Sequence, residues 1–197
     1  SDAGLQTILR DARLFVSELG FRHDRTETLT GRNVALAFFE PSTRTRLSFE
    51  TAAHRLGAST VVFQPTGSSV VKGETLAETM ATINAMRFDA LIVRHADNGT
   101  HQQLTQIVDA PILNAGEGTV SHPTQALLDA SALLERRGTL QGAKVCVVGD
   151  VRHSRVARSQ VDVFRRLGAE YAVCAPQELL PAEEDGDLKD CRTFDSI

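Results

Sequence analysis

Aromatic residues and cysteines are scarce in this sequence, which has no Trp, one Tyr and three Cys in 197 residues. It therefore lacks the aromatic platforms on which single-stranded nucleic acids stack, and a net charge of −4 provides no basic field for nucleic acid. The cysteines Cys146, Cys174 and Cys191 form no CxxC pair and leave an odd count, which argues against a disulfide framework. We expect a protein of a reducing, cytoplasmic compartment with no nucleic-acid partner.

Long hydrophobic runs are also missing. No window approaches the roughly 18 apolar residues of a membrane span, and the first residues lack the basic and apolar segments of a signal peptide. The His, Cys and carboxylate residues show no metal-ligand spacing, so we expect neither a membrane partner nor a metal. Small-molecule chemistry is the leading class of function.

Lysine is rare, since 18 of the 21 basic residues are Arg. One of the three lysines, Lys72, lies in a loop between Gly67 and Gly73. A compact, flexible ammonium there suits the neutralisation of a leaving phosphate in a loop that closes and reopens. The alternative is a solvated loop lysine.

Short apolar runs alternate with amphipathic helical patterns, which is typical of an α/β fold with a parallel sheet flanked by helices. The predicted strands are 34–39, 60–63, 90–93, 111–114, 144–148 and 171–174. The predicted helices are 44–56, 74–86, 123–137 and 155–167. We expect Gly57 to end the first helix and Pro123 to lie near the start of the third.

Gly138 and Gly142 interrupt the pattern, and they predict two similar α/β domains, residues 1–137 and 138–197. The second contains only two or three predicted strands, followed by an acidic, Pro-containing loop. So few strands do not make a stable open sheet, and we expect this second domain to be incomplete in the chain.

The segment 38–46, FFEPSTRTR, joins a predicted strand directly to a predicted helix. Backbone N–H groups at a helix start lack partners, and the hydroxyls of Ser42, Thr43 and Thr45 add donors. The guanidinium of Arg44 can bind two oxygens at once. An ordinary Ser/Thr cap is the alternative, but four donors in one turn at the carboxyl end of a strand favour a phosphate cradle.

A second strand-turn-helix begins at Gly149–Asp150. This turn has one Gly where the dinucleotide motif GxGxxG needs three, so we expect no cofactor. Arg155, at the start of the following helix, fits a carboxylate ligand better than a redox cofactor.

Several segments together resemble the aspartate and ornithine carbamoyltransferases, in the order of that family and over nearly all of the chain. They are STRTR at 42–46, SSVVKGETLAETM at 68–80, Val93-Arg94-His95, His122-Pro123-Thr124-Gln125, and Gly149-Asp150 followed by Arg152 and Arg155. KGET at 72–75, and Glu40 directly before Pro41, favour the aspartate branch.

The resemblance implies transfer of the carbamoyl group of carbamoyl phosphate to the amine of L-aspartate, giving N-carbamoyl-L-aspartate and phosphate in pyrimidine biosynthesis without a cofactor. It assigns residues 1–137 to a carbamoyl-phosphate-binding domain, with the start of the interdomain helix, and 138–197 to part of an aspartate-binding domain. Ornithine carbamoyltransferase is one alternative. A noncatalytic, carbamoyltransferase-like assembly subunit is another.

The resemblance also implies roles for single residues at the carbamoyl phosphate. Ser42, Thr43, Arg44 and Thr45 hold the phosphate, and Thr45, Arg94 and His122 stabilise the oxyanion at the carbonyl carbon. On position alone, a surface arginine is the alternative for Arg94. A helix start disfavours imidazolium, so His122 fits a neutral N–H donor, although an isolated His there is more often a cap. The resemblance alone gives Gln125 its role, the orientation of the carbamoyl amide.

For the second substrate, the resemblance gives Arg155 a carboxylate of aspartate, and Lys72 also lies at the aspartate site. Glu40 is expected to hold an arginine such as Arg155. Ser68 and Lys72 are expected to reach the neighbouring subunit's site, which implies a homotrimer with intersubunit active sites. The sequence leaves open whether regulatory chains or a dihydroorotase attach.

Overall fold

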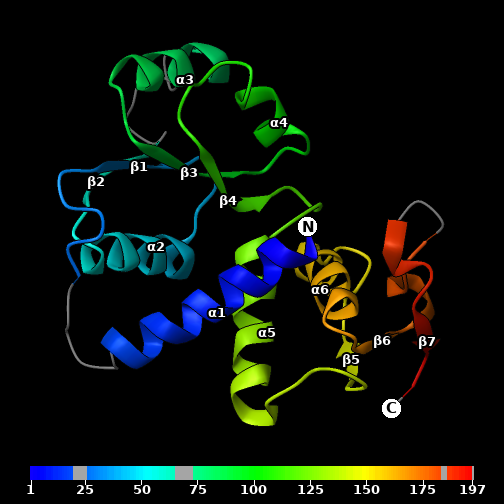
Figure 1. The fold of residues 1–197 in the computed structure, drawn as a ribbon. Helices are drawn as coiled ribbons and strands as arrows, with labels where there is room; N and C mark the ends of the chain where they lie inside the picture. Colours follow the sequence, from blue (N-terminus) through cyan, green and yellow to red (C-terminus); the bar gives the residue numbers. More distant parts are fainter. Residues whose placement is uncertain (20–25, 65–72, 183–185, 197) are drawn as a thin grey trace. The chain divides into compact units, whose positions relative to one another are not determined.

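The computed structural model describes residues 1–19, 26–64, 73–182 and 186–196 (Figure 1). Its helices are α1 (Asp2–Leu19), α2 (Thr43–Arg55), α3 (Leu76–Ala85), α4 (Thr100–Leu104), α5 (Pro123–Arg137) and α6 (Arg155–Arg166), with short 3-10 turns at Gln177–Leu179 and Gly186–Leu188. Its strands are β1 (Asn33–Phe38), β2 (Ser59–Phe63), β3 (Ala90–His95), β4 (Ile112–Glu117), β5 (Lys144–Val148), β6 (Glu170–Cys174) and β7 (Arg192–Phe194). The predicted α/β class is confirmed, because all strand pairs are parallel.

Packing divides the chain into two compact units. The central unit is Phe15–Gly118, and the terminal unit combines Ser1–Leu14 with Thr119–Ile197. Helix α5 belongs to the terminal unit because it packs on α6. The boundary at residue 137, which follows sequence motifs rather than packing, stays a prediction.

The sheet of the central unit has the order β2-β1-β3-β4, with helices on both faces (Figure 1). Side chains alternate between the faces of a strand. Val34 and Leu36 of β1 therefore share a buried cluster with Ala53 of α2. Ala35, between them, shares the opposite cluster with Met80 of α3. Burial on both faces explains why β1 is a continuous apolar run.

The terminal unit is built on a three-stranded sheet of order β5-β6-β7. Val173 of β6 and Phe164 of α6 lie in its core, which also includes Ala126 of α5. Leu5 and Leu9, from the first turns of α1, belong to the same buried cluster. The two ends of this unit in the sequence thus share one core.

The six predicted strands and four predicted helices are confirmed, with ends that shift by up to three residues. Gly57 ends α2 as predicted: its φ is +86°, and its N–H donates to the carbonyl of His54 at 3.1 Å. The next N–H, of Ala58, donates to Ala53 at 3.0 Å. Helices α1 and α4, both 3-10 turns and strand β7 were not predicted.

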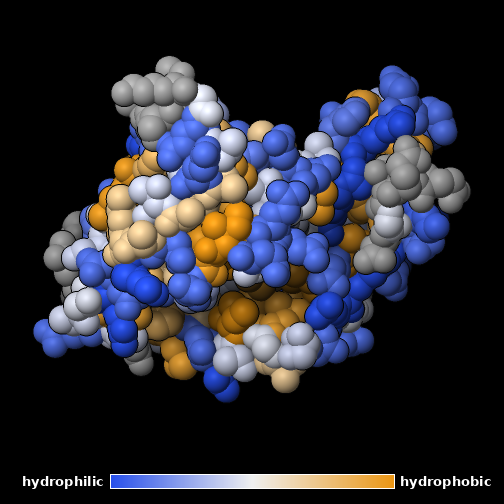
Figure 2. All heavy atoms as spheres, turned by 90° about the horizontal axis from the view of Figure 1, so that it is seen from above, coloured by the Kyte–Doolittle hydropathy of each residue, from blue (hydrophilic) through white to orange (hydrophobic). Residues whose placement is uncertain are grey.

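Hydrophobic side chains reach the surface in small patches among hydrophilic ones (Figure 2). Leu47, Val61 and Met86 are at least half exposed. None of the helices within the described ranges is both long and apolar enough to cross a membrane.

Candidate functional site

The start of α2 is a helix end whose backbone donors are left without a side-chain cap. Ser42 is the N-cap residue, with extended φ and ψ of −159° and 104°, and its hydroxyl makes no capping hydrogen bond. The first turn holds no acidic residue. The first N–H groups of any helix also have no acceptor within the helix. An ordinary Ser cap is therefore not what the structure contains here.

Helix α3, in the same unit, has the side-chain cap that the start of α2 lacks. Its N-cap residue Thr75 accepts a hydrogen bond from the N–H of Glu78 at 3.2 Å, and the carboxylate of Glu78 accepts from the N–H of Thr75 at 2.8 Å. This reciprocal capping box satisfies the helix start and places a negative charge there. The start of α2 has neither, so it keeps its attraction for an external anion.

The predicted cradle residues lie together in this turn. Ser42 and Thr45 are half-buried, whereas Thr43 and Arg44 are exposed. The turn follows β1, and Phe39, just beyond β1, donates its N–H to the carbonyl of Arg94 at 2.9 Å. The segment before α2 and the end of β3 therefore lie side by side at the carboxyl edge of the parallel sheet, where ligands of such sheets bind.

Arg94 lies near the end of β3, and its side chain is only 9% exposed. Its Nη2 donates to Oε1 of Glu40 at 2.9 Å, and its Nη1 donates to the carbonyl of Ala115 at 3.3 Å. Its Nε is buried without a hydrogen-bond partner. Arg94 is thus a fixed, buried guanidinium rather than a surface arginine. The partner of Glu40 seen here is Arg94, and the expected contact of Glu40 with an arginine such as Arg155 stays a prediction.

A bulge in β4 provides the carbonyl that holds Arg94. The pairing of β4 with β3 shifts register between Asn114 and Glu117. Within this interval Gly116 has a φ of +126°, which favours glycine, and its N–H donates to the side-chain Oδ1 of Asn114 at 2.7 Å. Asn114 therefore stabilises the bulge from which Ala115 accepts the guanidinium.

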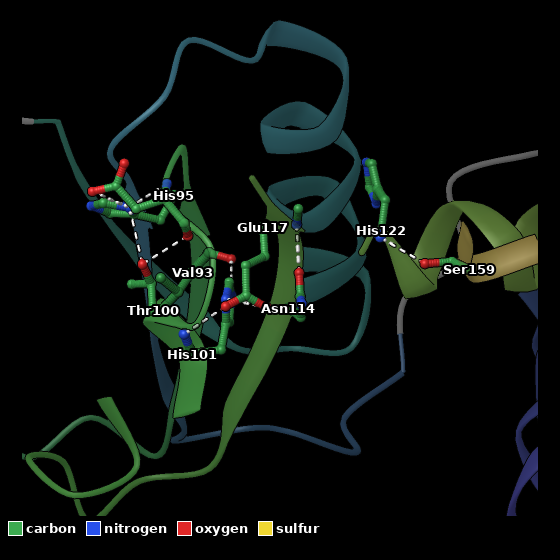
Figure 3. A network of polar contacts seen from close by, with 10 residues as sticks. Val93, His95, Thr100, His101, Asn114, Glu117, His122 and Ser159 are labelled. Carbon is green, nitrogen blue, oxygen red and sulfur yellow. Dashed lines mark hydrogen bonds and ion pairs between the residues drawn. The ribbon is translucent and has the colours of Figure 1, made fainter. Parts of the chain in front are cut away.

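Polar side chains continue from this edge into a network that sequence reasoning missed (Figure 3). Nδ1 of His95 accepts from the N–H of Asp97 at 3.0 Å and lies 3.2 Å from Oγ1 of Thr100. Burial lowers the pKa of His95, although the carboxylate of Asp97 acts in the opposite direction. The neutral ring is the form that can accept these hydrogen bonds. His95 therefore organises the turn between β3 and α4.

Glu117 anchors α4 to β4 in the same network (Figure 3). Its Oε1 accepts from the N–H of His101 at 3.1 Å, and its Oε2 lies 3.4 Å from Nδ1 of that ring. The other ring nitrogen lies 2.9 Å from the carbonyl of Val93. Apart from the motif containing His95, no local sequence pattern predicts this network, because its members come from separate elements.

In the terminal unit, His122 is the N-cap residue of α5 and is 7% exposed. Its backbone N–H donates to Oγ of Ser159, on α6, at 2.8 Å (Figure 3). Its ring makes no capping hydrogen bond. The capping role that an isolated His often has at a helix start is therefore not observed, and Pro123 follows at the first helical positions as predicted.

Gln125 begins a hydrogen-bond chain through the terminal unit. Its Nε2 donates to Oδ1 of Asp129 at 2.9 Å, and Oδ2 of that carboxylate accepts from Nε2 of Gln160 at 2.5 Å. Oε1 of Gln160 accepts from the hydroxyl of Tyr171 at 3.0 Å. The spacing of four between Gln125 and Asp129 on a helix was the only sequence signal for this chain.

The loop after β5 is ordered by local hydrogen bonds. The carboxylate of Asp150 accepts from the N–H of His153 at 3.2 Å and lies 2.9 Å from Nδ1 of the ring. Ser154 caps α6 by accepting from the N–H of Ala157 at 3.1 Å. Arg155 is the first residue of α6 and is half-buried, at the helix start where it was expected.

Two predicted site residues, Ser68 and Lys72, lie outside the described residues. Among the residues that the structure does describe, no group of three or more His, Cys, Asp or Glu side chains could hold a metal ion. The predicted site residues that the structure describes are the cradle, Glu40 and Arg94 in the central unit and His122, Gln125 and Arg155 in the terminal unit.

Comparison with known proteins identifies similar chains. Residues 1–135 match the family model described as aspartate/ornithine carbamoyltransferase, carbamoyl-P binding domain. The aspartate carbamoyltransferase catalytic subunit of Solibacter usitatus is 47% identical over 181 residues, which cover 92% of this chain and 60% of that protein. Aspartate transcarbamoylase of Trypanosoma cruzi in complex with carbamoyl phosphate superposes with a TM-score of 0.88 at 30% identity, covering 98% of this chain and 62% of that one. The catalytic subunit of M. jannaschii aspartate transcarbamoylase superposes with a TM-score of 0.84 at 33% identity, covering 98% of this chain and 64% of that one. The chain spans less than two thirds of each relative.

Proposed function

Since the chain belongs to the aspartate/ornithine carbamoyltransferase family, we propose that it binds carbamoyl phosphate and transfers the carbamoyl group to L-aspartate. The products are N-carbamoyl-L-aspartate and phosphate, a step of pyrimidine biosynthesis. The observation that carries this proposal is the uncapped start of α2 next to the buried Arg94. The names of the similar proteins support aspartate rather than ornithine as the acceptor.

The phosphate binds at the start of α2. The hydroxyls of Ser42, Thr43 and Thr45 and the first N–H groups of the helix donate to its oxygens, and Arg44 binds two of them. Since this helix start carries no capping bond and no acidic residue, it can bind the anion without first breaking an internal contact.

The carbamoyl carbonyl lies against groups that stabilise negative charge. The amine of aspartate attacks the carbonyl carbon, and the bond from that carbon to the phosphate oxygen breaks. Phosphate leaves with the bonding electrons and takes up the proton that the attacking nitrogen loses. Thr45, Arg94 and His122 donate to the oxyanion that forms between these steps. The two bonds from Arg94 to Glu40 and Ala115 fix the guanidinium before the reaction, which reduces its reorganisation. Gln125 binds the amide of the carbamoyl group.

Aspartate binds through Arg155 and Lys72. We further propose that Ser68 and Lys72 enter the site of the neighbouring subunit in a homotrimer, and that the protein is cytoplasmic.

The test is calorimetric binding of carbamoyl phosphate to the 197-residue chain, together with an assay of labelled carbamoyl-aspartate formation. We expect Arg44→Gln to weaken binding at least about tenfold, because one charge-assisted contact is lost. The matched control is Arg87→Gln, because that side chain is 79% exposed and lies outside the site. Equal binding of carbamoyl phosphate by wild type and Arg44→Gln would contradict the assignment of the phosphate site to the start of α2.

The acceptor and the loop lysine are tested in the same preparation. With L-aspartate and L-ornithine offered in parallel, we expect product from aspartate alone. Lys72→Ala is expected to reduce the rate of transfer while leaving phosphate binding at α2 intact. Faster reaction with ornithine would overturn the assignment to aspartate.

A further inference from the structure

The hydrogen-bond chain from Tyr171 to Gln125 has a fixed direction. We propose that Asp129, itself held by Gln160 and Tyr171, locks the amide of Gln125 with its carbonyl oxygen available to the ligand, so that the site selects an acyl phosphate bearing an NH2 group. This inference rests on the proposed function, and it adds Asp129, Gln160 and Tyr171 as positioning residues.

The carboxylate of Asp129 determines the direction. An ionised carboxylate only accepts hydrogen bonds, so both glutamines that contact it must present their NH2 ends. Gln125 does so at 2.9 Å, and Gln160 does so at 2.5 Å. Rotating the Gln125 amide by half a turn would set its oxygen against a carboxylate oxygen, which replaces a charge-assisted hydrogen bond with repulsion.

Tyr171 fixes the far end of the chain. Its hydroxyl donates to Oε1 of Gln160 at 3.0 Å and lies 3.4 Å from the carbonyl of Ala157, a second acceptor. Rotation of the Gln160 amide would set its oxygen against the carboxylate of Asp129 and lose the charge-assisted bond of 2.5 Å. Burial raises the pKa of Tyr171 well above its ordinary value, so the hydroxyl keeps its proton and remains a donor. Its ring is also anchored by Phe164, at a centroid distance of 5.9 Å.

The free end of the chain is therefore an acceptor. Within the described part of the chain, Oε1 of Gln125 has no hydrogen-bond partner, and the residue is half-buried. Gln125 also follows His122 by one turn, with its N–H donating to the carbonyl of His122 at 3.1 Å. A half-buried acceptor of this kind favours a ligand NH2 over a methyl group, because the methyl leaves the oxygen unpaired.

The test compares carbamoyl phosphate with acetyl phosphate, which has a methyl group in place of NH2. The measured quantity is the ratio of their dissociation constants, obtained by calorimetry on the full chain. In Asp129→Asn, the new amide can accept from Gln160 only if its own NH2 points to Gln125. To accept from that NH2, Gln125 must turn its side-chain oxygen toward the new amide. The NH2 of Gln125 then becomes the end that faces the ligand. We expect the preference for carbamoyl phosphate to fall about tenfold.

Two controls accompany this measurement. Asp162→Asn removes a half-exposed carboxylate of α6 that pairs with Arg166, and it should leave the ratio unchanged. Inorganic phosphate should bind wild type and Asp129→Asn equally, because the cradle is in the other unit. This shows that a changed ratio does not come from lost phosphate binding.

If Asp129→Asn does not fold, the exchange of side-chain amide protons in the wild type tests whether Asp129 holds the NH2 group of Gln125. We expect the NH2 protons of Gln125 to exchange with D2O at least about tenfold more slowly than those of the exposed Gln102, because Asp129 holds them. Equal exchange rates for Gln125 and Gln102 would contradict the inference that Asp129 fixes the orientation of the Gln125 amide.

The failures are distinguishable. If the wild type prefers carbamoyl phosphate and Asp129→Asn keeps that preference, the inference is wrong and the proposed function stands. If the wild type binds no carbamoyl phosphate at all, the proposed function is wrong and the inference falls with it.

Discussion

Arg94 and Glu40 are paired by a hydrogen bond of 2.9 Å between Nη2 and Oε1, although 54 positions separate them in the sequence. The pair joins the end of β3 to the segment that leads into α2. Its cation is nearly buried, with 9% of the side chain exposed, whereas 27% of the glutamate side chain is exposed. The pair therefore links the stability of the central unit to the position of a proposed catalytic group.

Replacing Glu40 should destabilise the protein strongly. In Glu40→Ala the buried charge of Arg94 loses its counter-ion, and we expect the free energy of unfolding to fall by about 3 kcal/mol. Urea unfolding followed by circular dichroism measures this loss. Asp109→Asn is the control, because its partner Arg87 and Asp109 are both more than 70% exposed, and it should cost less than about 1 kcal/mol. Equal losses in the two variants would contradict the buried character of the first pair.

Replacing Asn114 should make the position of the Arg94 guanidinium less fixed, because Asn114 stabilises the bulge whose carbonyl, at Ala115, accepts from Arg94. In Asn114→Ala the 2.7 Å bond to the N–H of Gly116 is lost, so the Ala115 carbonyl is less firmly placed. We expect a loss of about 1 kcal/mol in the free energy of unfolding, together with weaker binding of carbamoyl phosphate. Calorimetry and urea unfolding measure the two effects.

Asn84 offers a matched control for that variant. Its side chain accepts from the N–H of Asp109 at 3.0 Å, so Asn84→Ala removes a similar bond in the same unit. We expect a similar loss of stability with unchanged binding of carbamoyl phosphate. If both variants weaken binding equally, the bulge has no special connection to Arg94.

Acidification should destabilise the central unit through His95. Burial lowers the pKa of His95 in the folded state below its ordinary value of 6.5. The unfolded chain then binds the proton more readily, so stability is lost as the pH falls from above 6.5 through the folded-state pKa. We expect His95→Gln to reduce the difference between the free energies of unfolding at pH 7.5 and pH 5.5. His54→Gln, at an exposed position of α2, tests whether the loss of any histidine has this effect.

Gly57 should tolerate no side chain. Its φ is +86°, and an added Cβ would lie 2.9 Å from Oγ1 of Thr30 and 3.0 Å from the carbonyl of Thr26. Gly31 has a similar φ of +79° with nothing within 4 Å of an added Cβ. We expect Gly31→Ala to cost about 1 kcal/mol for backbone strain alone, and Gly57→Ala to cost at least about 2 kcal/mol. Equal melting temperatures for the two variants would show that the contacts with Thr26 and Thr30 are unimportant.

The regular elements could be predicted because their signals are local. The apolar run of β1 and the Gly after α2 each act within a few residues, so they can be read directly. Helix α1 was missed although Leu5 and Leu9 have helical spacing, and both are buried. Strand β7 has three residues and α4 has five, which is too short for a period to appear.

The residues of the candidate site also fall into those with a local sequence signal and those without one. Ser42 to Thr45 are adjacent in sequence, so their shared chemistry was visible. The pairing of Arg94 with Glu40, the bulge around Ala115, and the link from Asp129 to Gln160 depend on separate elements. No local pattern encodes such pairs, because the sheet and the helix packing bring them together.

The shared core of Leu5 and Leu9 with Ala126 has a consequence for the order of synthesis on the ribosome. Helix α1 is translated before the central unit, but its packing partners follow the whole central unit in the sequence. The central unit can fold as soon as it emerges, since domains fold as units during translation. Until the residues after 118 emerge, the buried positions Leu5 and Leu9 of α1 have no native packing partner. Nascent chains stalled shortly after residue 118 should therefore expose this helix to a chaperone or a protease, and longer chains should protect it.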